Sequence, residues 1–537
     1  MCLGENVDYL LRRLQSSSAV ERNRAAIELG RFSFKSEEEK NRAIRALIER
    51  LQNDPNELVR RAVAMSLGRI GGRDAIEALD RAMREDRSPY VRTMARARLT
   101  NLLDRLIRVI PVVSNKIIPP RVWYSVPVSI RVEGDVIKDI TLSFSGTGIR
   151  ALPAEIRELR PGDEVRAEVD TIVEEGLGPA ITVNLTLSYK DRLGRKHVGP
   201  PVQVELDLRS RPPVNIDVPG YRLEYLLGSG QSGNVWLARA VGAEKKAILE
   251  ERGLSPDDLV AIKVPRTPSL VYMDEKVKND FREEASIWSK LDHPHIVKLV
   301  DFGLPEEGGA NVPYLVMELM PGGTLRRLLE KQVLDWVSAA KISVSILKAL
   351  EHAHGKLKAH RDIKPENVLM TDIDVSDPSS CLKVSDWGLA KMSTFSSLAH
   401  EFKGTPDYAA PEQWLEYYLQ RYKVDKSVSK DLERLCQVLE IDVNEIEHPG
   451  ELIDKRVDIY QTGAVLYEML TGRTPMMSKR PEEIRETLKP APPSQLNPDV
   501  PPALDQVVLK ALEKRKEDRY QRAEDMKKAI LEVLASR

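Results

Sequence analysis

Apolar residues in the N-terminal part of the chain recur at the spacing of α-helices, and the pattern repeats. The stretch Asn41–Leu47 (NRAIRAL) returns 32 residues later as Arg73–Leu79 (RDAIEAL). Turn-forming residues at Asp54–Asn56 and Gly71–Gly72 separate the helical stretches. Because paired helices at a period of about 30 to 45 residues are typical of solenoids, the pattern predicts an α-solenoid over residues 1–110.

This segment resembles HEAT repeats, and the resemblance implies a module that binds other proteins. Residues 1–110 contain 22 Lys and Arg, 20 of them Arg, against 16 Asp and Glu. Two interpretations are open. The surplus forms a concave basic face for an acidic partner, or it belongs to a solvated helix surface, because Arg side chains cover apolar surface well. We favour the second over nucleic-acid binding and expect a protein partner for the repeats.

Between residues 111 and 210 the helical spacing gives way to alternation of apolar and polar positions. Strands are predicted at residues 121–132, 140–144, 165–169, 180–189 and 202–208. Several short strands separated by turns predict a β-sandwich. The region is similar to immunoglobulin-like domains, although it lacks their Cys…Trp…Cys pattern. We expect a spacer or adhesion role, with Trp123 in a core rather than in a ligand site, and an extended linker at Pro212–Pro213.

The clearest chemical signal lies in residues 359–370 (AHRDIKPENVLM) and in the tripeptide D-W-G that begins at Asp386. Asp362 can accept a proton from an attacking hydroxyl, and Lys364 can reach the same phosphate. Asn367 and Asp386 offer the oxygen ligands that Mg²⁺ prefers together with phosphate oxygens. An H-R-D triplet alone also occurs by chance in a solvated turn. The complete string with the downstream D-x-G is far more specific.

Over residues 218–537 these motifs resemble the eukaryotic-like serine/threonine protein kinase family. The resemblance implies a bilobal α+β fold, ATP and Mg²⁺ as cofactors, and transfer of the γ-phosphate to protein hydroxyls. Lys364 in the catalytic loop argues against tyrosine specificity. The predicted chain is therefore multidomain: an α-solenoid at 1–110, a β-sandwich at 111–210 and a protein kinase domain at 218–537.

A glycine-rich loop is predicted at Leu227–Val235 (LGSGQSGNV), where missing side chains let backbone amides approach phosphate oxygens. Dinucleotide-binding folds share this spacing, but their loop leads directly into a helix, whereas residues 235–239 have the pattern of a strand. By the kinase resemblance, Lys263 binds phosphates and pairs with Glu284, with Glu283 as the alternative. The predicted nucleotide-binding residues are Gly228, Ser229, Gly230, Gly233, Val235, Ala261, Lys263, Met317, Glu318, Met320 and Leu369.

The resemblance also assigns finer roles around the hinge. The backbones of Glu318 and Met320 are expected to bind adenine, with Met317 as the gatekeeper. A stacked spine is expected from Leu299, Trp288, Trp387 and His360. The family usually has Phe at the position of Trp387 and a smaller residue at that of Trp288, and two indoles bury a large area. The sequence leaves open whether they stabilise the active or the inactive arrangement.

The string GTPDYAAPE, which ends at Glu412, resembles the end of a kinase activation segment. By this resemblance Thr405 bridges the catalytic aspartate and lysine, and Glu412 forms an ion pair with Arg519. The segment 415–457 is longer than the usual connection. The charged, helical pattern of its core at 430–446 predicts an inserted helix pair over the substrate side, of unknown role.

Arg361 resembles the arginine that pairs with an activation-loop phosphate in related kinases. Glu401, four residues before Thr405, occupies the place that is phosphorylated in one branch of the family. Two interpretations stay open: a Glu401–Arg361 pair that gives partial constitutive activity, or a solvated loop residue. Phosphorylation of upstream hydroxyls could add activity; the candidates are Ser393, Thr394, Ser396 and Ser397.

Composition argues against a nucleic-acid-binding protein, a membrane protein and a disulfide-bonded or zinc-binding protein. A length of 537 residues suits about three domains, and a formal net charge of −1 gives no strong attraction to nucleic acid or membranes. Cys2, Cys381 and Cys436 are odd in number and far apart, which indicates a reducing compartment without disulfides or a zinc site. No signal-peptide pattern or apolar run of ~18 residues is present, so we expect a cytoplasmic protein without membrane contact.

Two other functions compete with that of a protein kinase. A pseudokinase scaffold, in which the repeats do the work, usually lacks the lysine or one of the aspartates, whereas Lys263, Asp362, Asn367 and Asp386 are all present. A small-molecule kinase fits less well, because Ala410–Glu412 (APE) resembles the platform for a protein substrate. We therefore expect a protein substrate.

Overall fold

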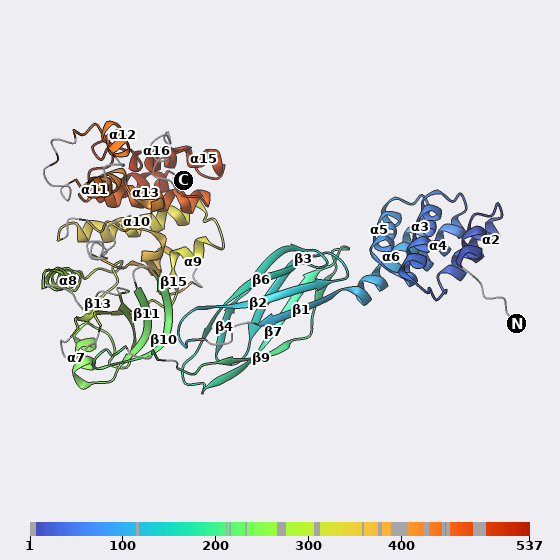
Figure 1. The fold of residues 1–537 in the computed structure, drawn as a ribbon, viewed down its shortest axis with the longest axis horizontal. Helices are drawn as coiled ribbons and strands as arrows, with labels where there is room; N and C mark the ends of the chain where they lie inside the picture. The colour runs from blue at the N-terminus through green and yellow to red at the C-terminus, as the bar shows by residue number, and fades with distance from the viewer. Residues whose placement is uncertain are drawn as a thin grey trace. The chain divides into compact units, whose positions relative to one another are not determined.

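The computed structural model describes residues 7–113, 118–210, 212–213, 216–230, 233–265, 275–305, 312–356, 359–373, 378–387, 406–422, 429–442, 446, 452–475 and 490–536. The chain divides into two compact units (Figure 1). One unit comprises residues 1–118 and 124–208, and the other comprises residues 119–123 and 209–537. The short segment 119–123 therefore packs with the second unit although both of its neighbours in the chain belong to the first.

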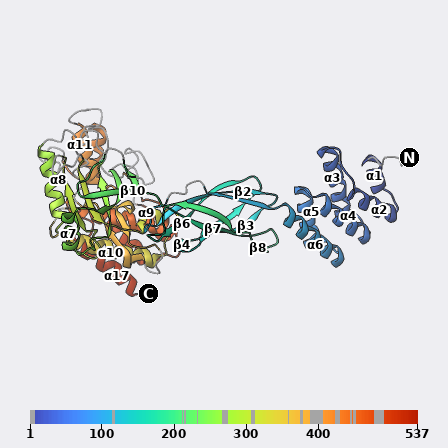
Figure 2. The same ribbon diagram turned by 90° about the horizontal axis from the view of Figure 1, so that it is seen from below.

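The predicted solenoid is a series of antiparallel helices in two rows. The helices are α1 (Val7–Leu14), α2 (Ala19–Leu29), α3 (Glu37–Asn53), α4 (Glu57–Ile70), α5 (Arg73–Glu85) and α6 (Pro89–Leu106). Helices α2, α4 and α6 pack beside one another, and α1, α3 and α5 form the adjacent row (Figures 1 and 2). Ser18, Asn56 and Ser88 cap the starts of α2, α4 and α6 with their side-chain oxygens. The repeat pattern thus corresponds to stacked helix pairs.

Two buried arginines at equivalent places in successive repeats tie each repeat to the next. Arg22 binds both carboxylate oxygens of Asp54, at 2.6 and 3.0 Å. Arg60 binds both oxygens of Asp86 in the same way, at 2.9 and 3.0 Å. Such bidentate pairs are strong and directional. Part of the arginine surplus in the repeats is therefore structural, which supports the interpretation that does not invoke a basic binding face.

The β-rich region consists of two antiparallel sheets. Its strands are β1 (Arg108–Val113), β2 (Tyr124–Glu133), β3 (Ile137–Ser145), β4 (Ile149–Leu152), β5 (Ala154–Leu159), β6 (Glu164–Val173), β7 (Ala180–Lys190), β8 (Lys196–Val198) and β9 (Val202–Asp207). One sheet has the order β1-β2-β6-β4, and the other has the order β5-β3-β7-β8, with β9 also paired to β7. Alternate residues of β2 and β3, including Val128 and Leu142, are buried in one shared hydrophobic cluster. The alternation seen in the sequence therefore marks the faces that meet this cluster.

The predicted strand 121–132 begins three residues late, at Tyr124. Arg121 has a φ of +59°, which is left-handed backbone and not strand. Trp123 is 2% exposed, as expected of a core residue, but it belongs to the second compact unit and not to the β region.

The second unit starts with a five-stranded antiparallel sheet in the order β10-β11-β12-β14-β13. The strands are β10 (Tyr221–Gly230), β11 (Gly233–Ala240), β12 (Leu259–Val264), β13 (Leu299–Gly303) and β14 (Tyr314–Glu318), and the helix α8 (Glu275–Trp288) follows β12. Helix α7 (Ala243–Glu251) lies between β11 and β12, and its Leu249 is buried in the same cluster as residues of these strands. This helix is therefore packed onto the sheet.

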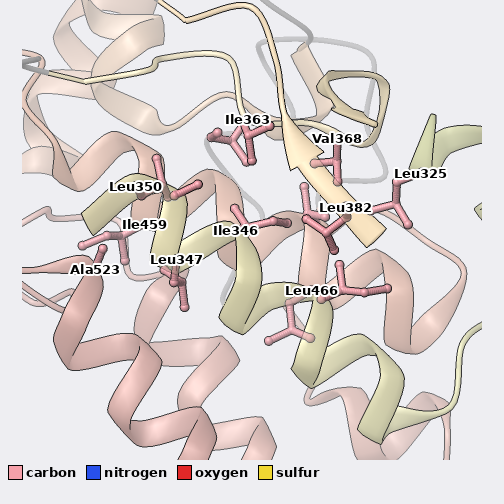
Figure 3. Packing of buried hydrophobic residues seen from close by; sticks show 14 of the residues in the cluster. Leu325, Ile346, Leu347, Leu350, Ile363, Val368, Leu382, Ile459, Leu466 and Ala523 are labelled. Atoms are coloured by element: carbon pink, nitrogen blue, oxygen red, sulfur yellow. The ribbon is translucent and has the colours of Figure 1, made fainter. Parts of the chain in front are cut away.

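A larger, helical lobe follows. Its elements are β15 (Gly323–Thr324), α9 (Leu325–Leu329), α10 (Trp336–Ala353), β16 (Val368–Met370), β17 (Leu382–Val384), α11 (Pro411–Tyr422), α12 (Ser429–Leu439), α13 (Arg456–Thr471), α15 (Pro493–Leu496), α16 (Pro502–Ala511) and α17 (Ala523–Ala535). Helix α10 lies at the centre, packed on both α13 and α17. Ile346 and Leu350 of α10 belong to one buried cluster with Ile459 and Leu466 of α13 and with residues of the small sheet (Figure 3). This core is the platform on which the loops of the site lie.

Of the helix pair predicted for the inserted segment, the described residues contain one helix in the core at 430–446, which is α12. Apolar residues of α12, including Leu435 and Leu439, pack with Trp414 and Leu415 of α11 in a separate small cluster. The insertion thus extends α11 into a helix pair with its own core. Among the described residues, no helix is both long enough and apolar enough to cross a membrane.

We predict that Asp54→Ala destabilises the repeats, because it leaves the guanidinium of Arg22 buried without its carboxylate. Breaking such a buried pair costs about 3–5 kcal/mol. Thermal unfolding followed by circular dichroism should show the loss, whereas Asp74→Ala, at an exposed position of α5, should be near neutral. Equal stability of the two variants would contradict the structural role of the pair.

The effect should depend on pH. Burial acts to raise the pKa of Asp54, but hydrogen bonds from Arg22 and from the Asn56 N–H outweigh it and hold the pKa below its ordinary value. A carboxyl group with a lowered folded-state pKa stabilises the fold above its unfolded pKa of about 3.9 and loses this contribution as pH falls further. The stability gap between wild type and Asp54→Ala should therefore be full near neutral pH and shrink below about pH 4.

Candidate active site

The loop between α10 and β16 brings three predicted catalytic residues together. The carboxylate of Asp362 lies 2.8 Å from Lys364 Nζ and accepts a 2.9 Å hydrogen bond from Asn367 Nδ2. Both contacts use Oδ2, so Oδ1 is the oxygen that can accept a proton from a hydroxyl group. Asn367 also donates to the Asp362 carbonyl at 2.8 Å, from a 3-10 turn at Pro365–Asn367. The short spacing in the sequence thus becomes one constellation.

Asp458 of α13 holds the backbone of this loop. Its side chain is 0% exposed and accepts hydrogen bonds from the N–H groups of His360 and Arg361, each at 2.7 Å. His354 Nε2 lies 2.8 Å from the same carboxylate. A buried carboxylate is tolerated when hydrogen bonds satisfy it, and here those bonds come from the residues next to Asp362.

Two glutamines complete the support of the loop. Gln461 accepts from the Ile363 N–H at 2.9 Å and donates to the Arg361 carbonyl at 3.0 Å. Gln413 donates to the same carbonyl, also at 3.0 Å. Arg361 has a φ of +71°, and left-handed backbone costs a non-glycine residue roughly 1–2 kcal/mol. The hydrogen bonds to both of its peptide groups offset this cost.

The sequence analysis missed the supporting role of Asp458, Gln461 and Gln413. A signal was present in the string D-I-Y-Q-T-G within α13, where an aspartate and a glutamine lie among the apolar residues of a largely buried helix. Buried polar side chains in such a helix need partners, and the loop backbone supplies them.

Lys263 and Asp386 form an ion pair although 123 positions separate them: Nζ lies 2.7 Å from Oδ2. Lys263 is 5% exposed, and Asp386 has a φ of +63°, a second left-handed residue in the site. Glu284 of α8 is also buried. The predicted lysine and metal-ligand aspartate are thus adjacent, and pairing of Lys263 with Glu284 stays a prediction.

The four residues of the predicted spine are all buried in the second unit: Leu299, Trp288, Trp387 and His360. His360 and Trp387 pack edge to face, with 4.7 Å between ring centroids. Each indole N–H has a backbone acceptor at 2.8 Å: the carbonyl of Val297 for Trp288 and that of Val384 for Trp387. The larger side chains are therefore accommodated with their polar atoms satisfied.

The glycine-rich loop is the turn between β10 and β11. A Cβ atom at Gly233 would lie 2.4 Å from the Val264 carbonyl oxygen, and its φ is +140°, so this position requires glycine for packing. At Gly228 and Gly230 no described protein atom lies within 4 Å of an added Cβ. Packing against the described residues therefore does not require glycine at these two positions, and their predicted role in binding phosphate stays a prediction. Ser229 Oγ donates to Asn234 Oδ1 at 2.7 Å.

Four of the residues predicted to face adenine lie on strands β11, β12, β14 and β16, and Met320 follows β14. Ala261, Met317 and Met320 are buried, while Val235 and Leu369 are partly buried against the same core. Residues Ala261 and Met317 are direct partners in the β12–β14 pairing. The Glu318 carboxylate lies 2.8 Å from Lys383 Nζ and accepts the Lys298 N–H at 2.7 Å. These contacts fix the end of β14 where the hinge begins.

The predicted ion pair between Glu412 and Arg519 is present. Arg519 binds both carboxylate oxygens, at 2.7 and 2.8 Å, and both residues are buried. Arg519 also donates to the backbone carbonyls of Glu513 and Lys514 at 2.8 Å. The pair fixes the start of α11 and, through it, the neighbouring Gln413.

Tyr408, just before α11, is held by a network of charged side chains. Its hydroxyl donates to Glu468 at 2.5 Å, and Arg326 binds Glu468 and Glu366 at 2.7 and 2.8 Å. Burial, together with the hydrogen bond to Glu468, raises the pKa of the Tyr408 phenol well above its ordinary value. The hydroxyl is therefore a neutral donor that joins α13 to the segment before α11.

Several predicted features lie outside the described residues. These are Gly388, Thr405, Glu401 and the phosphorylation candidates Ser393, Thr394, Ser396 and Ser397. The bridge from Thr405 and the pairing of Glu401 with Arg361 stay predictions.

A cluster of metal-binding residue types occurs in the first unit, but it forms an ion-pair network. Asp104, Asp191 and His197 lie close together. Arg195 binds Asp104 at 2.9 Å and Asp191 at 2.6 Å. Burial acts to raise the pKa of Asp191, but hydrogen bonds from His197 and Arg195 hold it below its ordinary value. The guanidinium already supplies the positive charge that a cation would bring.

Comparison with known proteins agrees with the site. Residues 221–426 match the family model of the protein kinase domain, and residues 7–100 match that of HEAT repeats. The predicted kinase and HEAT-repeat modules are thus confirmed, and neither of these two family models covers the β-rich region between them.

The curated relatives of this chain include several serine/threonine-protein kinases. A probable serine/threonine-protein kinase of Clostridium acetobutylicum is 33% identical over 259 residues, which are 47% of this chain and 33% of the relative. Serine/threonine-protein kinase pkn3 of Myxococcus xanthus is 30% identical over 325 residues, 58% of this chain and 50% of the relative. Serine/threonine-protein kinase PknB of Mycolicibacterium smegmatis is 31% identical over 326 residues, 58% and 43% respectively.

The match to this chain spans a third to a half of the length of these relatives. Their resemblance therefore concerns a part of these relatives and not their whole length. These curated relatives are serine/threonine-protein kinases, and the chain also carries HEAT repeats. With the kinase motifs assembled as described, residues 221–426 belong to the protein kinase domain family.

Proposed function

We propose that this protein is an ATP-dependent kinase that phosphorylates serine or threonine hydroxyls of a protein substrate. The observation that carries the proposal is the catalytic loop, in which Lys364 and Asn367 hold Asp362 by one carboxylate oxygen and leave the other to face a hydroxyl. The alternative of a pseudokinase scaffold has no missing residue in its favour, because Lys263 and Asp386 are present and adjacent.

The residues of the candidate active site fit ATP and Mg²⁺ by their chemistry. Both hydrogen bonds of Asn367 to Asp362 use its amide nitrogen, so the amide oxygen is available as a hard ligand. Asp386 supplies a carboxylate, and Mg²⁺ typically takes one or two such protein oxygens together with phosphate oxygens. Gly228 and Gly230 leave room for the phosphates. When bound, Mg²⁺ neutralises charge that develops on the transferred phosphoryl group.

The other residues have positioning and binding roles in this proposal. Asp362 orients the attacking hydroxyl and accepts its proton, and Lys364 holds that carboxylate in place through its 2.8 Å contact with Oδ2. Lys263, held by Glu284 in the nucleotide-bound state, binds the α- and β-phosphates. Positioning and preorganised charge of this kind supply most of the rate enhancement in phosphoryl transfer.

Adenine binding is assigned to the hinge. The backbones of Glu318 and Met320 bind the purine edge, Met317 limits the back of the pocket, and the apolar faces above and below come from Val235, Ala261 and Leu369.

The remaining parts of the chain are assigned by analogy. The HEAT repeats bind a protein partner that brings substrate or places the kinase. The β-rich region is a β-sandwich of immunoglobulin-like type that acts as a spacer, since its two antiparallel sheets share one core. A cytoplasmic location is proposed from the free thiols of Cys381 and Cys436, which suit a reducing compartment.

We predict that Asp362→Asn in the full chain lowers phosphotransfer by about 10²- to 10⁴-fold, because the carboxylate that accepts the proton is lost, while ATP still binds. Lys263→Met and Asp386→Asn should abolish autophosphorylation and leave the circular dichroism spectrum unchanged. Transfer from radiolabelled ATP to a generic basic protein measures all three. Asp257→Asn, whose side chain is 80% exposed, is the control and should match wild type. Substantial activity in Lys263→Met or Asp386→Asn would overturn the assigned roles.

We further predict that Asp458→Asn lowers kcat at least about 10²-fold, because the amide cannot accept from both loop N–H groups and each unsatisfied buried donor costs about 1–3 kcal/mol. The KM for ATP should change little, since the nucleotide contacts lie elsewhere. The matched control is Asp505→Asn: Asp505 of α16 is also buried and accepts from the Ser494 N–H at 2.9 Å. Both variants should lose stability, but only Asp458→Asn should lose kcat. Parallel behaviour of the two would show that Asp458 has a stability role alone.

A further inference from the structure

The segment Pro119–Trp123 packs as part of the kinase unit, although it precedes the first kinase strand by the whole β-rich region. Two neighbouring side chains of this segment are buried there: Val122 is 8% exposed and Trp123 is 2% exposed. None of the kinase motifs includes these residues. The kinase motifs therefore do not explain why Val122 and Trp123 are buried in the kinase unit.

Trp123 is bound by the helical lobe through three hydrogen bonds. Its indole N–H donates to Asp372 Oδ1, just after β16, at 2.7 Å. Its backbone N–H donates to the Pro321 carbonyl at 2.9 Å, and its own carbonyl accepts from Arg327 of α9 at 2.6 Å. The indole N–H, the backbone N–H and the carbonyl of Trp123 are thus all bound, by residues of the hinge and of the helical lobe.

Val122 packs against the other lobe. It shares a small hydrophobic cluster with Tyr225 of β10, Leu237 of β11 and Leu259 of β12, and Leu319 of the hinge packs against the same cluster. Consecutive residues therefore contact opposite lobes at the hinge. The preceding residue, Arg121, is in the left-handed region with a φ of +59°, which is uncommon for a non-glycine residue.

The two contacts at the hinge enclose one residue of the proposed nucleotide site. Val122 belongs to the cluster that includes Leu319, and Trp123 binds the carbonyl of Pro321. Met320, whose backbone is assigned to adenine, lies between them in the chain. Its carbonyl is also fixed, by the Gly323 N–H at 3.2 Å. Both neighbours of the adenine-binding residue are therefore held from one short segment.

We propose that Val122 and Trp123 are positioning residues for nucleotide binding: they hold the hinge and fix the backbone of Met320 for adenine. This inference rests on the proposed kinase function. Rotation of one lobe against the other has to shift Val122 within its cluster or strain the hydrogen bonds of Trp123. The segment thus limits the hinge conformations and reduces the ordering that nucleotide binding would otherwise require.

The test uses the full chain and ADP with Mg²⁺ as the probe. In Trp123→Ala and Val122→Ala the Kd for ADP, measured by calorimetry, should rise about 5- to 20-fold. The KM for ATP should rise by the same factor, while kcat and the KM for a generic protein substrate stay within about twofold. Hydrogen exchange at the hinge amides of residues 319–324 should become faster. A purely structural role would lower the active fraction and leave the Kd unchanged.

Milder variants keep the test decisive if an alanine variant does not fold. Trp123→Phe and Asp372→Ala each remove the indole hydrogen bond and should raise the Kd about two- to fourfold. Asp372→Asn keeps the acceptor oxygen, and Val333→Ala changes a side chain that is 51% exposed; both should match wild type. Unchanged Kd and hinge exchange in Trp123→Phe and Asp372→Ala would overturn the inference.

The outcomes also separate this inference from the proposed function. If wild type binds ADP with the expected variant pattern but transfers no phosphate, the kinase proposal fails and the positioning role stands. If wild type phosphorylates substrate and the variants bind ADP normally, the positioning role fails alone. Absence of ADP binding by folded wild type would overturn both.

Discussion

The buried carboxylate of Asp458 is the contact on which the rest of the site depends. An ionised group without water is costly unless hydrogen bonds satisfy it, and the donors here are the backbone N–H groups of His360 and Arg361. The cost of burying the charge and the strain at Arg361 are therefore met by the same hydrogen bonds. The loop and the aspartate thus satisfy each other's buried polar groups.

A continuous series of contacts leads from this loop to distant parts of the helical lobe. The Arg361 carbonyl accepts a hydrogen bond from Gln413, the residue after Glu412. Glu412 is bound in turn by both terminal nitrogens of the Arg519 guanidinium. Arg519 is in turn bonded to the carbonyls of Glu513 and Lys514. The segment between α16 and α17, which contains Arg519, thus helps to set the position of Asp362. Arg519 therefore contributes to the site although it lies over a hundred positions away in the chain.

The sequence predicted what depends on short spacing and failed where long-range packing decides. Asp362 and Asn367 lie five positions apart, so one turn brings them together in any fold that keeps it. The Glu412–Arg519 pair spans 107 positions and was found only through the family resemblance. The alternation around Trp123 looks the same whether the side chain enters a sheet or a separate lobe. Likewise, the sequence assigned the arginines of the repeats, Arg22 and Arg60 among them, to a solvated surface. The aspartates that bind these two arginines come from the next repeat, so no local pattern marks the pairs.

The two tryptophans of the spine show how a departure from the family pattern can add structure. Phenylalanine has no donor, whereas each indole N–H must find an acceptor when buried. Trp288 binds the Val297 carbonyl, and Trp387 binds that of Val384. The Val297 N–H itself donates to the Val384 carbonyl at 2.9 Å. Helix α8 and the residue after Asp386 are therefore anchored to the same pair of backbone segments, a link that ring stacking alone does not make.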